Sequence, residues 1–503
     1  MKNIKQKLDN FFSITKRNSN IKTEIFAGLT TFISMAYILV VNPNNILLNG
    51  TQDSRFSSVF IATAIGAFVG TLFMALLAKM PLAQAPGMGL NALVGTIIGG
   101  AMGYNYSYGN AMAMIFISGL LFLLLSYIPY EKNKESNKYI SLREKIFEGI
   151  PKAIIDSISV GVGLFIAFIG LQNAHIITSN EYTLVELVKF NDPASWLPGG
   201  EACMALVALI GLIIIGVLSH YKVNGAIVWG IAISTLIAIP LGVADINILL
   251  GKYTGIGWNF KNSLINYFNI FNDNSVFLSL FKGGFIFPKG SIPTTIMLIT
   301  AFFLIDLFDT MGTLIGCCKN ANLIDELGKP VNYGEMMYAD SAASITGSLV
   351  GTSTISTFVE SSTGISAGGR TGLTALTTAI LFILSIFLLP LFAFIPSPAA
   401  ASALIYVGVL MMANIKKVDF KNVKNAIPSF ITIVIMLLSY SITDGIGIGI
   451  IVYFLIDMLI YLIDLIRYKT NKSKKKPSTD VTPITIVIVI LFLIYFLMPT
   501  IKW

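Results

Sequence analysis

The sequence predicts an all-α polytopic membrane protein, and three observations indicate this fold class. Hydrophobic residues make up 55% of the 503 positions and charged residues only 12%, whereas soluble domains carry about 25% charged residues. Apolar runs of about 20 residues, the length of a transmembrane helix, recur along the whole chain. The basic residues gather between particular runs, as they do on the cytoplasmic side of membrane proteins.

The apolar runs predict fourteen membrane segments, seven on each side of a long loop. They lie near 24–48, 57–79, 84–101, 110–130, 150–172, 201–219 and 224–250, and then near 292–318, 335–351, 352–370, 372–396, 399–414, 428–441 and 444–467. A last run at 482–499 either spans the membrane or lies against it, and the sequence does not choose. The first run is too long for the apolar part of a signal peptide, so we expect no cleaved leader.

The distribution of Lys and Arg predicts the orientation in the membrane. With residues 1–23 as a cytoplasmic tail, all but seven of the 34 basic residues fall on the cytoplasmic side. The seven on the outer side are Arg55, Lys189, Lys252, Lys261, Lys282, Lys289 and Lys502. This asymmetry is the positive-inside pattern, so the net charge of +8 reflects topology and does not indicate nucleic-acid binding.

Seven segments per half is an odd number, so the second half enters the membrane inverted relative to the first. The third segment of each half is unusual. In the first half, "PLAQAPGMGLNALVG" is interrupted by Pro86, Gly87 and Gly89; in the second, "GTSTISTFVESSTGISAGGRTG" surrounds Glu360 with small polar residues. Interrupted segments at matching positions of two halves are typical of a transporter's midplane binding site.

The alternative interpretation makes both interrupted segments surface loops. Removing either one as a membrane segment would place the Lys-rich connections on opposite sides of the membrane, against the positive-inside pattern. Non-helical backbone at membrane depth must be buried in protein or line a cavity. We therefore expect both segments to lie inside the protein.

A second polar group lies in the eighth segment. Asp306 and Asp309 are three residues apart and share roughly one helical face, with Thr313 one turn beyond Asp309. A carboxylate at the bilayer centre costs about 2.5–3.5 kcal/mol and usually marks a substrate or ion pathway. The alternative is an internal salt bridge, but no Lys or Arg occurs in the middle of a predicted segment, since Lys79 and Arg370 lie at segment ends.

Five motifs carry a resemblance to a known family. The chain resembles the xanthine/uracil permease superfamily from about residue 22 to 468, and more narrowly its hypoxanthine/adenine/guanine permease branch. The motifs are "FAGLTTFISMAYILVVNP" at 26–43, "APGMGLNA" at 85–92, "DLFDTMGTLIG" at 306–316, "GTSTISTFVESSTGISAGGRTGLTA" at 351–375 and "ITDGIGIGI" at 442–450.

The resemblance implies two inverted seven-segment repeats, arranged as a core domain that moves like an elevator against a gate domain. The core would comprise 24–130 and 292–396, and the gate 150–250 and 399–468, with 482–499 as an extra helix. The third and tenth segments would each contain a short strand, and the two strands would pair antiparallel at the centre. Related transporters often dimerise through the gate domain, so a homodimer is an expectation.

The resemblance also implies which residues bind substrate, between the two strands and the eighth segment. The matching positions are Ser34, Asn91, Asp309, Thr313, Val359 and Glu360. Asp309 and Glu360 match the acids of the eighth and tenth segments, and either could carry a coupling proton. We assign Glu360 to hydrogen bonding with the base and Asp309 to the proton. Thr313 stands where uracil transporters have a His, which puts a His relay in doubt here.

The function expected from the resemblance is import of purine nucleobases across the plasma membrane by proton symport, with no metal or cofactor. A uracil, xanthine or anion carrier of the same fold is an alternative, although an anion carrier should place a basic residue at the site. A membrane-embedded enzyme is another, but the chain has only two His and no H-E-x-x-H motif. The sequence determines neither the preferred purine nor whether sodium replaces the proton.

Overall fold

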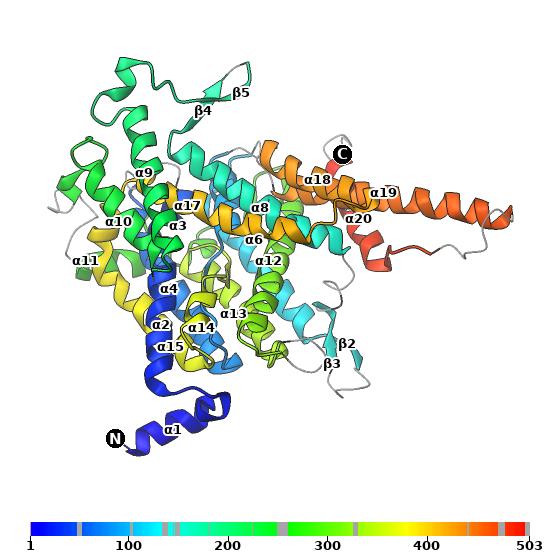
Figure 1. Ribbon diagram of the computed structural model, residues 1–503, viewed down its shortest axis with the longest axis horizontal. Coiled ribbons are helices and arrows are strands. Elements are labelled where there is room, and N and C mark those ends of the chain that lie inside the picture. The colour runs from blue at the N-terminus through cyan, green and yellow to red at the C-terminus, as the bar shows by residue number, and fades with distance from the viewer. Residues whose placement is uncertain are drawn as a thin grey trace.

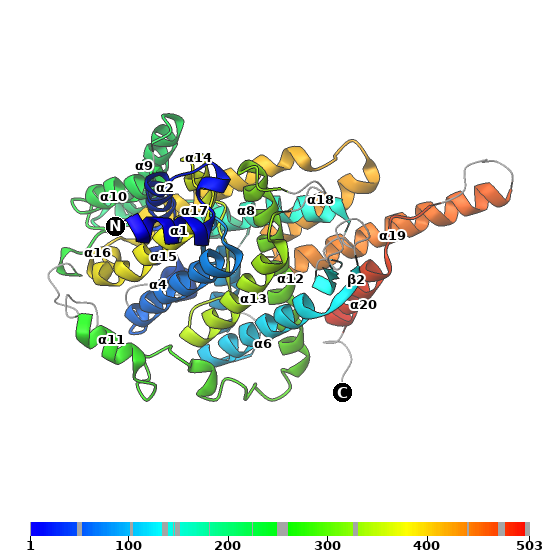
Figure 2. The same ribbon diagram turned by 90° about the horizontal axis from the view of Figure 1, so that it is seen from below.

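The computed structural model describes residues 2–47, 53–100, 104–132, 139–143, 145, 151–180, 182–223, 225–248, 260–324, 330–439, 442–470 and 478–497. This part of the chain is mostly helical (Figures 1 and 2). Within it, eight helical stretches are long and apolar enough to cross a membrane: Ile21–Ile46, Phe56–Ala78, Tyr108–Tyr127, Lys152–Asn173, Glu201–His220, Gly372–Ala393, Ser397–Lys417 and Asp444–Lys469. The protein is therefore a multi-pass membrane protein.

The first half of the chain contains the following helices and strands. They are α1 (Lys2–Phe12), α2 (Ile21–Met35), α3 (Ile38–Ile46), α4 (Phe56–Phe73), β1 (Gln84–Pro86), α5 (Met88–Ile98), α6 (Tyr108–Tyr127), β2 (Pro129–Lys132), β3 (Tyr139–Ser141), α8 (Lys152–Asn173), β4 (Ile177–Asn180), β5 (Leu184–Leu187), α9 (Glu201–His220), α10 (Ala226–Ala238) and α11 (Phe260–Phe268). The hairpins β2–β3 and β4–β5 lie in connections that the sequence left without predicted structure.

The second half contains α12 (Ile292–Asn320), α13 (Tyr333–Val350), β6 (Ile355–Thr357), α14 (Ser361–Ser366), α15 (Gly372–Leu384), α16 (Leu389–Ala393), α17 (Ser397–Met412), α18 (Val423–Leu438), α19 (Ile442–Lys469) and α20 (Pro483–Leu497). The helix α20 packs against α19 and α12. It occupies the run at 482–499 that lies beyond the fourteen predicted segments.

Two strands far apart in the sequence pair at the centre of the fold. β1 and β6 are antiparallel, with Gln84 opposite Thr357, Ala85 opposite Ser356 and Pro86 opposite Ile355. Every residue of both strands is buried. The two strands lie in the segments that the sequence predicts to be interrupted, and the buried partner strand satisfies the backbone groups that a broken helix leaves unpaired.

The remaining helices pack in two groups around α12. In one group α2 and α4 pack against α15, and α13 packs against α4 and α6; in the other, α8 packs against α17 and α18, and α18 against α19. In Figure 1, α8, α17, α18 and α19 run roughly horizontally, whereas α2 and α12 run roughly vertically. α12 contacts β6, α14, α6 and α8, so it lies beside the strand pair and between the two groups.

Candidate functional site

Each strand of the pair is followed by the start of a short helix. Beyond the ladder, the Gly87 amide donates to the Thr354 carbonyl at 3.0 Å and the Phe358 amide donates to the Ala83 carbonyl at 3.0 Å. α5 then begins at Met88, with Gly87 as its N-cap, and α14 begins at Ser361, with Glu360 as its N-cap. The backbone therefore turns from strand to helix at the position of Glu360.

Gly89 differs from the sequence-based expectation. The sequence predicts that it interrupts any helix and lies at the strand contact, but it is the second residue of α5 and is buried. The close approach falls instead at Gly87, where an added Cβ would lie 2.9 Å from Ser356 Oγ and 3.4 Å from Asp309 Oδ2. A side chain at this position would compete with the hydroxyl that faces the acid.

Asp309 is held at the strand pair by β6. Its Oδ2 atom accepts a hydrogen bond of 2.9 Å from Ser356 Oγ, and the residue is half-buried. Ser356 is fully buried in the middle of the strand. The eighth segment therefore presents a carboxylate at the face of β6, beside the closely approaching Gly87.

Glu360 faces the first membrane segment. Its Oε1 atom accepts a hydrogen bond of 2.7 Å from the Tyr37 hydroxyl. Tyr37 lies between α2 and α3, where the first segment is broken, and is 1% exposed. Ser356, which donates to Asp309, lies four residues before Glu360, so the two predicted acids and the Tyr37 hydroxyl converge on one region.

Tyr37 and Ser356 are functional candidates that the sequence-based reasoning missed. A buried tyrosine hydroxyl usually needs a hydrogen-bond partner. This rule points to Tyr37 only once its burial is known, and the apolar sequence around it does not reveal that burial. Ser356 is one of many Ser and Thr residues in 351–372. Period-two alternation in the strand would have been its signal, but three residues are too short a strand to reveal it.

The other predicted residues lie close to the strand pair in different ways. Asn91 is fully buried; its Oδ1 atom accepts from Ser353 Oγ and its Nδ2 atom donates to the Pro86 carbonyl at 3.4 Å. Asn91 therefore ties α5 to the chain entering β6. Ser34 on α2 accepts a hydrogen bond of 3.1 Å from Thr363 Oγ1 of α14, which joins the first segment to the short helix after Glu360.

Thr313 and Val359 complete the predicted set. Thr313 lies on α12 and is 8% exposed, whereas the Val359 side chain is 54% exposed. The Val359 carbonyl accepts from the Ser362 amide at 2.9 Å, so this oxygen is used by the first turn of α14. The exposed Val359 side chain belongs to the residue directly before Glu360.

Asp306 belongs to a different group of side chains from Asp309. Residues three apart on a helix point about 60° apart, and this angle separates their partners. Asp306 Oδ2 accepts from Ser344 Oγ of α13 at 2.9 Å, and Asp306 Oδ1 lies 3.4 Å from Thr310 Oγ1. Both Asp306 and Thr310 are fully buried. The two acids therefore share roughly one helical face but have different hydrogen-bond partners.

A buried ion pair lies next to Asp306, and the sequence-based search for basic partners missed it. Arg143 Nη2 is 2.6 Å from Asp340 Oδ2 of α13, with both side chains fully buried. The guanidinium also lies over the Phe122 ring, 4.2 Å from its centroid. Arg143 was overlooked because it belongs to the charged connection between the predicted segments at 110–130 and 150–172. The chain after β3 instead inserts this residue into the protein.

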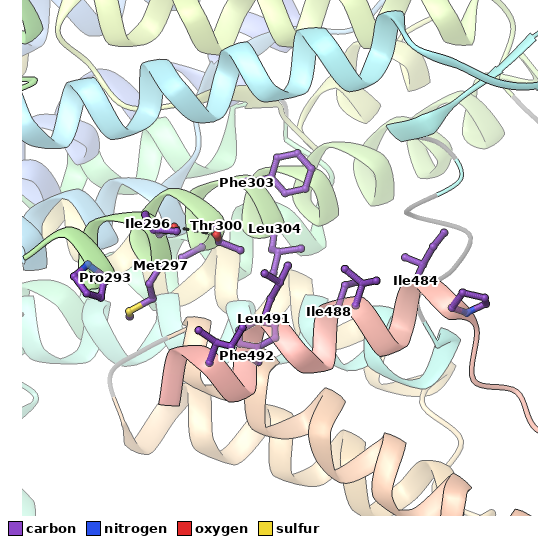
Figure 3. A pocket seen from close by; sticks show the side chains of 14 residues that line it. Pro293, Ile296, Met297, Thr300, Phe303, Leu304, Ile484, Ile488, Leu491 and Phe492 are labelled. Carbon is purple, nitrogen blue, oxygen red and sulfur yellow. Dashed lines mark hydrogen bonds between the residues drawn. The ribbon is translucent and has the colours of Figure 1, made fainter. Parts of the chain in front are cut away.

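An apolar cavity of about 370 Å³ lies between α12 and α20. Figure 3 shows Ile296, Leu304 and Phe492 among the side chains around it. Its one polar lining residue is Thr300, whose hydroxyl donates to the Ile296 carbonyl at 2.9 Å. The lining positions of α12 fall on the opposite side of the helix from Asp309 by helical periodicity. This cavity is therefore separate from the strand site and offers little to a polar ligand.

In the described residues, no three His, Cys, Asp or Glu side chains come together as a metal site. In the described part of the chain, the Asp309 and Glu360 side chains accept hydrogen bonds from hydroxyl groups. Such a site is a set of hydrogen-bonding groups held by two strands and two broken segments. Its chemistry suits recognition of a polar molecule.

Comparison with known proteins defines the class of this protein. The model of the xanthine/uracil Permease family matches residues 22–448, and the chain belongs to that family. It is 36% identical to the guanine/hypoxanthine permease PbuO of Bacillus subtilis, over 96% of this chain and 99% of that one. It is 33% identical to the adenine permease AdeP of Escherichia coli, over 97% and 95% respectively. These relatives place it in the branch that the motifs indicate.

The fold is shared with a transporter of another family. The transmembrane domain of the cyanobacterial bicarbonate transporter BicA superposes with a TM-score of 0.56 at 15% identity, covering 85% of this chain and 97% of that one. At this sequence identity the similarity concerns the fold alone. The permease relatives indicate a transporter and not an enzyme.

Proposed function

We propose that this protein imports purine nucleobases by proton symport, and that the base binds between the strand pair and α12. The observation that carries the proposal is the convergence of Glu360, Asp309 and Tyr37 where β6 passes into α14. The names of the relatives, which are adenine and guanine/hypoxanthine permeases, support purines as the substrate class.

The carboxylate of Glu360 suits a ring N–H of a purine. An ionised carboxylate has about four acceptor positions on its two oxygens, and Tyr37 uses one of them. The remaining positions are available for a donor of the base. A site that hydrogen-bonds its ligand in this way rejects analogues lacking the donor by up to about 10⁴-fold or more, because buried polar groups are left unpaired.

Asp309 is proposed as the acid that binds the coupling proton on loading and releases it inside. Its side chain accepts a hydrogen bond from a neutral hydroxyl, that of Ser356. A carboxylate without a cationic partner gains more from protonation than one in an ion pair. Asp309 also lies on a continuous helix that contacts both groups of helices, so its charge is placed where the two groups meet.

The proposed architecture is the fourteen-segment inverted repeat with a core and a gate domain that move against each other, and a possible homodimer through the gate. The two packing groups support this division. A cytoplasmic N-terminus in the plasma membrane is also proposed. In support, α1 and the β2–β3 hairpin lie at one end of the molecule in Figure 1, and the β4–β5 hairpin lies at the other.

Uptake into proteoliposomes tests the proposal. Labelled adenine should accumulate above its external concentration when the outside is acidic, and collapse of the proton gradient should release it. A sodium gradient without a proton gradient should give no accumulation. Equilibration without accumulation would contradict symport, and conversion of adenine to another compound would indicate an enzyme. Competition with unlabelled guanine, hypoxanthine, xanthine and uracil then ranks the bases.

A further inference from the structure

A layer of buried charge lies directly behind the strand pair. It consists of Asp306 and Thr310 on α12, Asp340 on α13, Gln84 on β1 and Arg143 from the chain after β3, all fully buried. Gln84 Nε2 lies 3.3 Å from both Asp340 Oδ1 and Thr357 Oγ1. The layer therefore touches both strands, because Thr357 belongs to β6.

The charges in this layer do not balance if both acids are ionised. Among the described residues, the hydrogen bonds of the Arg143 guanidinium go to Asp340, Ser341 and the Met337 carbonyl. Arg143 is committed to Asp340 through the 2.6 Å ion pair. Asp306 would then be an ionised carboxylate with no cationic partner of its own, next to two further acids. An unpaired buried charge is strongly unfavourable, and such a group neutralises instead.

The hydrogen bonds around Asp306 give the same answer by a separate count. Thr310 has one hydroxyl proton, yet its Oγ1 lies 2.9 Å from Asp340 Oδ1 and 3.4 Å from Asp306 Oδ1. A hydroxyl donates one hydrogen bond and can accept others. If Thr310 donates to Asp340 at the shorter distance, Asp306 must be the donor to Thr310 for the second contact to be a hydrogen bond.

Ser344 on α13 contacts the other oxygen of Asp306. Its Oγ lies 2.9 Å from Asp306 Oδ2 and 3.2 Å from the Ile355 carbonyl of β6. With one hydroxyl proton, Ser344 donates to one of these acceptors at a time. A neutral Asp306 carries its one proton on one oxygen, so Oδ1 can donate to Thr310 while Oδ2 remains an acceptor for Ser344.

We infer that Asp306 binds a proton, which it donates to Thr310 in the chain Asp306–Thr310–Asp340–Arg143, and that this is a proton-binding site separate from Asp309 and Glu360. With the proton bound, the layer holds one cation and one anion and is neutral. Loss of the proton to solvent leaves a second carboxylate behind the strands, linked to β6 through Ser344 and to β1 through Asp340 and Gln84. The use of this proton in transport rests on the proposed symport; its binding does not.

Infrared spectroscopy of the purified full-length protein tests the inference without purine or a proton gradient. A protonated carboxyl group has a carbonyl band that shifts when H₂O is exchanged for D₂O, and an ionised carboxylate lacks it. We expect one such band at neutral pH to disappear in Asp306→Asn and to persist in Asp309→Asn. Persistence in Asp306→Asn, or disappearance in Asp309→Asn alone, would overturn the assignment.

A second variant tests the hydrogen-bond chain and guards against misfolding of the first. Thr310→Val keeps the volume and the number of charged groups but removes the acceptor of the Asp306 proton. We expect the Asp306 band to remain present and to shift in frequency. An unchanged frequency would show that Asp306 does not donate to Thr310. If the bands behave as expected while reconstituted protein fails to accumulate adenine, the proton site stands and the proposed symport is wrong.

Discussion

Replacing Gly87 with alanine tests the geometry at the strand pair. The added Cβ would lie 2.9 Å from Ser356 Oγ, which is about 0.5 Å closer than ordinary van der Waals contact. The backbone at Gly87 has φ −68° and ψ 126°, which alanine adopts without strain. The hydroxyl of Ser356 must therefore move away from Asp309 Oδ2, its partner at 2.9 Å.

The loss can be estimated from that hydrogen bond. A hydrogen bond to a charged group contributes about 1.5–3 kcal/mol, and 1.4 kcal/mol corresponds to about a tenfold change in affinity. We therefore expect Gly87→Ala to weaken equilibrium binding of labelled adenine to the purified protein by roughly 10- to 100-fold. Gly216→Ala on α9 is the control, because nothing lies within 4 Å of its added Cβ.

A double-mutant cycle separates this mechanism from general damage. If Gly87→Ala acts by displacing the Ser356 hydroxyl, it should cost little more in a Ser356→Ala background, since the two changes remove one interaction. Costs that add in full, or wild-type binding by Gly87→Ala alone, would refute the proposed contact between Gly87, Ser356 and Asp309.

Three other predictions concern the binding site, the packing and the topology. Tyr37→Phe removes one donor to Glu360, so adenine binding should weaken by roughly tenfold; unchanged affinity would exclude Tyr37 from the site. Gly364→Ala would put a Cβ 2.6 Å from the Ala27 carbonyl and separate α14 from α2, whereas Gly334→Ala meets nothing within 4 Å. Only the first should lower the thermal unfolding midpoint, by an overpacking cost of about 1–3 kcal/mol. A single cysteine at 472, outside the described residues, should resist impermeant thiol reagents in intact cells, while Tyr182→Cys in the exposed β4–β5 hairpin should react; labelling at 472 would overturn the fourteen-segment count.

Composition and the spacing of apolar runs predicted a helical membrane protein, because apolar runs of about 20 residues are typical of transmembrane helices. The two interrupted segments were visible in the sequence, since Pro86, Gly87 and the polar stretch around Glu360 contrast with their surroundings. Those segments contain β1 and β6. The acids Asp309 and Glu360 were likewise conspicuous as charges in apolar company, although their roles stay a prediction.

The partners of these acids could not be predicted in the same way. Tyr37 reaches Glu360 across 323 positions of the sequence, and Arg143 reaches Asp340 across 197. Both contacts depend on tertiary packing and leave no local pattern. Arg143 was also misleading, because a basic residue in a charged connection is usually solvated, whereas here the chain after β3 buries it.

The most direct test of the proposed purine site compares Glu360→Gln with Asp309→Asn. Equilibrium binding of labelled adenine to each purified variant should be measured beside proton-driven uptake in proteoliposomes. We expect Glu360→Gln to lose binding, because one acceptor oxygen becomes a donor. Asp309→Asn resembles the protonated acid, so it should still bind adenine but fail to accumulate it against a gradient. The reverse pattern would exchange the two roles, and normal accumulation by both variants would place the site elsewhere.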